Sequence, residues 1–281
     1  MTSLAIPLAP SPSLVGLVLI TAIVTILLFV ERPRISRRIV VSFVPWMIVG
    51  SALSVLSTLI FYPGSIQPLV GTGAYLSTYV IVGVVWFAML QFSARRETNA
   101  ALADYLGAMG VGAAVVLVAF VILYAGPVSV LRLVWLLVVP VAAGFAAFVV
   151  LFLLGLRYID APAYTGVVGA LVVFGQTVDG ISTALGAGAF DTLGHTYLSW
   201  TVLDWIASAQ AAGLVGDDRL LVWTWGLVWV KMLIAALAVI LLTPVARERP
   251  SLGYLLLGLI AAVGITGGVA DLLLIAVGGS P

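Results

Sequence analysis

Apolar segments of about 20 residues follow one another along the chain with short polar links, and this pattern constrains the fold most strongly. Hydrophobic residues make up 63% of the sequence and charged residues 8%, whereas a soluble domain carries about 25% charged residues. We therefore predict an all-α fold, a polytopic membrane helix bundle that forms a single integral-membrane domain over residues 1–281. The predicted spans are residues 13–30, 39–60, 74–92, 109–124, 133–156, 163–185, 220–242 and 252–277.

Residues 186–219 decide how many times the chain crosses, because they are apolar only in their middle. If this region does not cross, one side of the membrane receives nine of the twelve basic residues and the other receives two. The positive-inside rule favours this eight-span arrangement. It places both termini outside the cell membrane and makes residues 196–211 an outer re-entrant or interfacial helix. The nine inner residues are Arg32, Arg34, Arg37, Arg38, Arg95, Arg96, Arg157, Arg247 and Arg249.

A weak internal repeat relates residues 50–58 to residues 175–183. The sequences GSALSVLST and GQTVDGIST align without a gap and share the first Gly and the final Ser-Thr. Both lie late in an even-numbered predicted span that follows a basic link. The repeat favours two four-helix halves in parallel orientation, residues 12–125 and 132–278, an arrangement that many transporters have.

Polar residues form a stripe inside the apolar sixth span. Gln176, Asp179, Ser182 and Thr183 are spaced so that they share one face of an α-helix. A carboxylate at membrane depth costs about 2.5–3.5 kcal/mol on insertion scales, so Asp179 should face protein or water. The hydroxyls of Ser182 and Thr183 are expected to bond back to their own backbone.

Two more ionisable residues, Lys231 and Asp271, interrupt the seventh and eighth spans. Counting about 1.5 Å per residue from the span ends places Asp179 and Asp271 in the outer half of the membrane and Lys231 nearer the middle. We predict that they line one buried polar site that opens outward. The candidate residues of this site are Gln176, Asp179, Thr183, His195, Lys231 and Asp271.

The candidate site has two compatible interpretations. Lys231 and one aspartate would form a structural ion pair, because unpaired charges in hydrocarbon are worse than paired ones. One lysine for two aspartates leaves a carboxyl that either carries a proton or awaits a cation. His195 is the only histidine, so it is expected to bond to backbone at the membrane interface, with an acid/base or mixed metal role as the alternative. We predict no metal and no cofactor.

Several motifs resemble one archaeal multi-pass membrane family, catalogued as domain of unknown function sixty-three. They are an Arg-rich link, VVSFVPWMIVGSAL, FGQTVDGISTALG, WVKMLIAAL and TGGVADLL. The resemblance implies an archaeal cell-membrane protein of about eight helices and supplies no activity. It matches Asp179, His195, Lys231, Gly268 and Asp271 to family positions. Members often carry a histidine where Gln176 stands and a basic residue where Ala270 stands, which weakens the case for a shared multi-histidine metal site.

Three functions remain open at this point. The first is transporter-like binding of a small solute or a proton from outside. The second is an intramembrane enzyme that acts on a lipid or lipid-linked substrate, and the third is a structural or assembly role in which the charges only lock helices together. The expected partners are membrane lipids and an unknown solute or lipid-like substrate. The near-zero net charge argues against nucleic acid.

Overall fold

The computed structural model describes residues 12–31, 33–60, 73–93, 99–126, 128–157, 160–187, 208 and 220–278. In these ranges the chain forms eight spans that are long and apolar enough to cross a membrane, so the predicted all-α polytopic bundle is confirmed. His195 lies outside the described ranges, and so does the predicted helix over residues 196–211 except for residue 208. The spans are α1 (Pro12–Glu31), α2 with α3 (Arg37–Ser42 and Val44–Leu59), α5 (Ala74–Ser93), α6 (Asn99–Tyr124), α7 (Val130–Arg157), α8 (Asp160–Leu185), α10 (Leu220–Glu248) and α11 (Pro250–Val277).

Two predicted boundaries were wrong. Helix α6 begins at Asn99 instead of residue 109, because the Ala-rich start of the helix continues into the core, where Leu102 and Leu106 are buried. Helix α10 continues to Glu248 instead of ending at residue 242. Its last turn packs tightly on the next helix, since a Cβ at Gly253 would lie 2.4 Å from Ala246 Cα.

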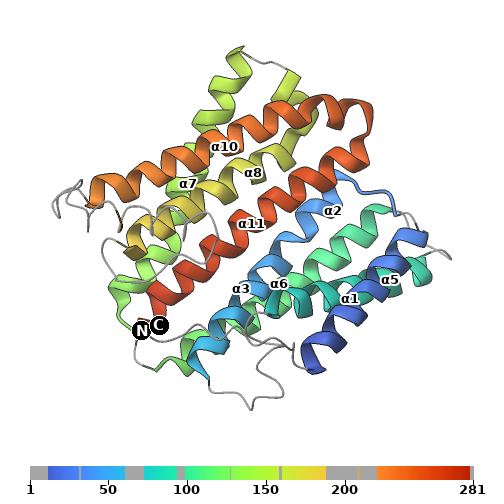
Figure 1. Ribbon diagram of the computed structural model, residues 1–281, viewed down its shortest axis with the longest axis horizontal. Helices are drawn as coiled ribbons and strands as arrows, with labels where there is room; N and C mark the ends of the chain where they lie inside the picture. The colour runs from blue at the N-terminus through green and yellow to red at the C-terminus, as the bar shows by residue number, and fades with distance from the viewer. Residues whose placement is uncertain are drawn as a thin grey trace.

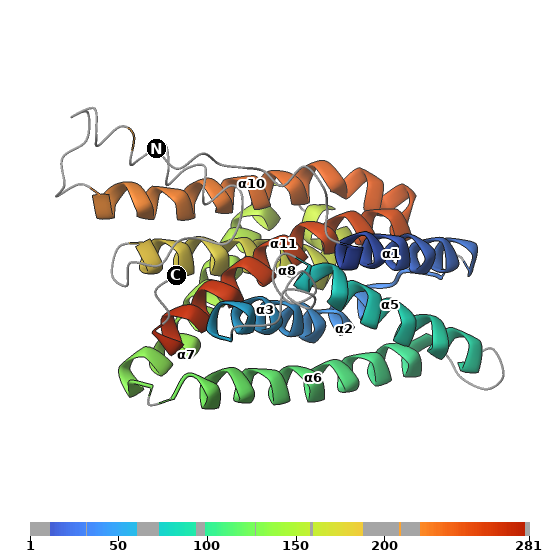
Figure 2. The ribbon, with the colours of Figure 1, turned by 60° about the horizontal axis from the view of Figure 1, so that its bottom comes forward.

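Helices α8 and α11 form the centre of the bundle and are the most buried spans, whereas α1 is the least buried. Helix α8 packs against α7, α10 and α11, and α3 packs against α5, α6 and α11. Figure 1 shows α11 between α8 and α3, and Figure 2 shows α10 and α6 on opposite sides of this layer. The two sets of helices meet at α3 and α11, where Ser51 Oγ donates to the Thr266 carbonyl at 2.8 Å. The division into four-helix halves stays a prediction.

The two ends of the bundle differ in charge. Arg37 contacts the beginnings of α8 and α11, and Arg247 lies over the ring of Tyr164 at the beginning of α8. We call this end, where α10 ends and α2, α8 and α11 begin, the arginine-rich end. Among the described residues, Arg132 is the basic residue at the opposite end, beside Gly278. The basic residues of the arginine-rich end are Arg34, Arg37, Arg38, Arg157, Arg247 and Arg249.

Glycines allow α8 and α11 to approach until their backbones touch. A Cβ at Gly264 would lie 2.6 Å from Gln176 N, and one at Gly268 would lie 2.7 Å from Asp179 N. Because Gly264 and Gly268 are four residues apart, they form a small-xxx-small face of the kind that membrane helices use for close contact. This face sets the register of α11 on α8.

Replacing Gly264 with alanine should destabilise the protein, because its Cβ would meet backbone that cannot move away. We expect a loss of about 1–3 kcal/mol, the usual effect of overpacking, measured as a lower midpoint of thermal unfolding in detergent. Gly112→Ala is the matched control, since a Cβ there meets nothing within 4 Å. Equal midpoints for the two variants would contradict the close contact.

Candidate functional site

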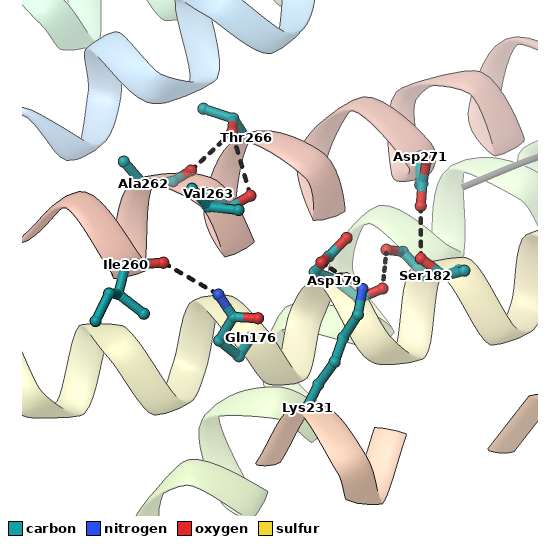
Figure 3. Close-up of polar contacts among 10 residues, drawn as sticks. Gln176, Asp179, Ser182, Lys231, Ile260, Ala262, Val263, Thr266 and Asp271 are labelled. Atoms are coloured by element: carbon teal, nitrogen blue, oxygen red, sulfur yellow. Dashed lines mark hydrogen bonds and ion pairs between the residues drawn. The ribbon is translucent and has the colours of Figure 1, made fainter. Parts of the chain in front are cut away.

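Three buried ionisable residues meet at the centre of α8, α10 and α11. Lys231 Nζ forms an ion pair with Asp179 Oδ2. Asp271 Oδ2 accepts a hydrogen bond of 2.9 Å from Thr183 Oγ1, and both aspartates interact electrostatically with Lys231. Each of the three ionisable side chains is 1% exposed, and Figure 3 shows them on neighbouring helices. Asp179, Lys231 and Asp271 therefore lie near one another, and that they form an outward-opening site stays a prediction. We call these three residues with Thr183 the polar cluster.

Glycines bring the helices close enough for this cluster to form. A Cβ at Gly180 would lie 3.0 Å from Val228 Cα and 3.6 Å from Lys231 Cδ. The absence of a side chain at Gly180 therefore lets α10 lie against α8 and lets the lysine extend along α8 to Asp179. On the other side of α8, Gly268 of α11 touches the backbone of Asp179. The residue that carries the central carboxylate is thus enclosed from two sides by protein.

The remaining polar residues of the sixth span contribute in different ways. Gln176 Nε2 donates to the Ile260 carbonyl at 3.0 Å, which ties α8 to α11 about one turn from Asp179. Ser182 Oγ donates to the Asp179 carbonyl at 3.2 Å, as expected for a hydroxyl in a membrane helix. Thr183 differs, because its bond to Asp271 crosses between helices and was not predicted from the sequence.

Sequence reasoning also missed Tyr75, an exposed residue in the first turn of α5. Its ring lies against α3, since a Cβ at Gly50 would lie 3.2 Å from Tyr75 Cδ1. Its hydroxyl interacts with Ser54 of α3. A tyrosine at the start of an apolar span carries no local signal that points to a site two helices away. The structure thus adds a contact of α5 with α3, which in turn packs on α11.

Among the described residues, no group of three or more histidine, aspartate or glutamate side chains is arranged to hold a metal ion. His195, the remaining candidate residue, lies outside those residues. Two carboxylates, one ammonium and one hydroxyl can exchange protons or hold a cation by their oxygens.

Comparisons of the chain with protein-family models, curated proteins and solved structures give no match.

Removing one partner of the ion pair should be worse than removing both. Lys231→Met leaves a buried carboxylate without its ammonium, an effect of about 3–5 kcal/mol in buried pairs, whereas replacing both partners by apolar residues is often neutral. We expect Lys231→Met to lower the free energy of unfolding in detergent and the added change Asp179→Leu to restore most of it. A double variant as unstable as the single variant would contradict this account of the pair.

Proposed function

We propose that this protein is a transporter-like membrane protein that binds a proton or a small solute at the polar cluster. The observation that supports the proposal is the meeting of two acids and one base inside the bundle, all buried. Ionisable side chains at membrane depth are expensive, and they usually mark proton relays or substrate pathways. The cluster contains two acids and one base among the described residues, a composition that suits the binding of a proton or a cationic group.

The two aspartates have different roles in this proposal. Asp179 and Lys231 neutralise each other, which removes most of the penalty of burying either charge. Asp271 receives a hydrogen bond from the neutral hydroxyl of Thr183. In this proposal Asp271 is the residue that binds the proton or the cationic group of the solute. Release toward the other side of the membrane would make this binding a transport step.

The uneven distribution of arginines supports an orientation in which the arginine-rich end lies on the inner side of the cell membrane and both termini lie on the outer side. The polar cluster then lies toward the outer side, because Thr183 and Asp271 are near the ends of α8 and α11 that are remote from the arginines. We also propose that the polar cluster opens toward the outside of the cell.

The orientation can be measured with single cysteines, because the chain contains none of its own. Ser129→Cys lies between α6 and α7 at the end opposite the arginines, and Glu248→Cys is at the last residue of α10. In intact cells a membrane-impermeant maleimide should label Ser129→Cys and leave Glu248→Cys unlabelled until the cells are lysed. The reverse labelling pattern would overturn the orientation.

Proton movement is the most direct test of the cluster. Purified protein in liposomes that contain a pH-sensitive dye should dissipate an imposed pH gradient faster than protein-free liposomes, with the voltage held at zero by potassium and valinomycin. Asp271→Asn should reduce the rate to that of protein-free liposomes, because an amide cannot take up the proton. Asp104→Asn, a change of an exposed acid on α6, should keep the wild-type rate.

Two results would count against the proposal in its proton form. One is a wild-type rate equal to that of protein-free liposomes. The other is an Asp271→Asn variant that remains folded and dissipates the gradient as fast as wild type, which would leave the cluster with a structural role.

A further inference from the structure

Helix α8 is broken near its beginning, at Gly166. This residue has φ 55° and ψ −137°, a backbone conformation that is essentially confined to glycine. The break separates a short segment, residues 160–165, from the long part of α8 that carries Asp179. A break of this kind leaves the carbonyls of the preceding turn without their usual donors in the helix, so those carbonyls need partners from elsewhere.

Arg37 of α2 supplies these partners. Its Nη2 donates to the carbonyl of Tyr164 at 2.8 Å and to that of Ala163 at 3.2 Å. Its guanidinium group lies so close to the break that a Cβ at Gly166 would be 3.0 Å from Arg37 Nη1. The arginine therefore caps the short segment from a different helix.

The same side chain also holds α11. Arg37 Nε donates to Tyr254 Oη at 2.8 Å, and the guanidinium lies 5.4 Å from the centre of the Tyr254 ring. Tyr254 Oη lies 3.4 Å from the Tyr164 carbonyl, to which it donates. One arginine thus connects α2, α8 and α11 at the arginine-rich end, where Figure 1 shows α2 beside α11. We call Arg37, Ala163, Tyr164, Gly166 and Tyr254 the Arg37 latch.

The latch and the polar cluster lie at different depths of the same helix. Thirteen residues separate Gly166 from Asp179, which is about 20 Å along a helix. Between them, Val168 and Val172 of α8 are fully buried against Leu257 of α11 and Val239 of α10. This apolar layer lies on the route along α8 from the arginine-rich end to Asp179 and Lys231.

We propose that the Arg37 latch is a gate at the arginine-rich end of the bundle. When the bonds of Arg37 break, residues 160–165 pivot at Gly166, this short segment separates from α2 and from Tyr254 of α11, and water reaches the apolar layer below the polar cluster. The latch suits this role because it is made of polar bonds around a glycine break. The contacts of α2 with α8 and α11 are sparse compared with those between α8 and α11. The inference rests on the proposed function, since a gate serves a site that exchanges its ligand with both sides.

The gate can be tested by the accessibility of a buried cysteine. Val172→Cys introduces one thiol of similar size into the apolar layer of a chain that has no other cysteine. The protein is placed in lipid nanodiscs, which expose both ends, and the rate of reaction with a charged methanethiosulfonate reagent is measured. Adding Arg37→Gln should raise this rate at least about tenfold, because hydrogen bonds to a charged group are strong enough to shift a two-state equilibrium by that factor.

Arg38→Gln is the matched control, since Arg38 is the exposed neighbour of Arg37 on the same short helix. It should leave the rate unchanged. A second reporter, Val121→Cys, lies fully buried in α6 away from the route, and its rate should not change with Arg37→Gln. If Arg37→Gln does not fold, Tyr254→Phe replaces it, because this change removes only the hydroxyl that bonds to Arg37 and to Tyr164.

Equal rates in the Arg37→Gln and Arg38→Gln backgrounds would overturn the gate, and so would a rise at Val121→Cys as large as the rise at Val172→Cys. The result is separate from the test of proton movement. Faster labelling at Val172→Cys, without faster labelling at Val121→Cys, supports the gate. If the proteoliposomes at the same time show no flux that depends on Asp271, only the proposed function is contradicted. Flux that depends on Asp271 without faster labelling contradicts only the gate.

Discussion

The buried ion pair between Lys231 and Asp179 is the interaction on which the centre of the bundle depends. Neither charge is tolerated alone in hydrocarbon, so α10 and α8 must adopt the register that joins them. Gly180 makes this register accessible, because a side chain there would meet the backbone of α10 at Val228. The apolar surfaces of α8 and α10 alone would allow several arrangements of the two helices. The ion pair selects one of them.

Packing and polar chemistry occupy the same interface between α8 and α11. Gly264 and Gly268 bring α11 onto the backbone of α8, and this contact places Asp271 where Thr183 can donate to it. A change that separates the two helices would therefore disturb the polar cluster even if it altered no polar residue. This dependence explains why α8 and α11 are also the most buried spans.

Helix α8 connects the two features that we assign to function. Its long part carries Asp179 and Thr183, and its short first segment is held by Arg37 from α2 across the break at Gly166. The two features therefore lie on one helix, on either side of its break. The apolar layer around Val172 lies between the Arg37 latch and the polar cluster.

The sequence by itself determined the eight spans and the presence of a buried polar site. Hydropathy is a property of a short stretch of chain, and charges such as Asp179, Lys231 and Asp271 inside apolar spans have to find one another because lipid does not solvate them. The prediction from local polarity was wrong at the beginning of α6 and at the end of α10. Burial against other helices extends each helix beyond its most apolar stretch. Only the tertiary structure decided that Thr183 bonds to Asp271, that α8 breaks at Gly166 and that Arg37 caps the break. These contacts join residues that are far apart in the chain, and the approach of their helices depends on packing around glycines, which no local pattern specifies.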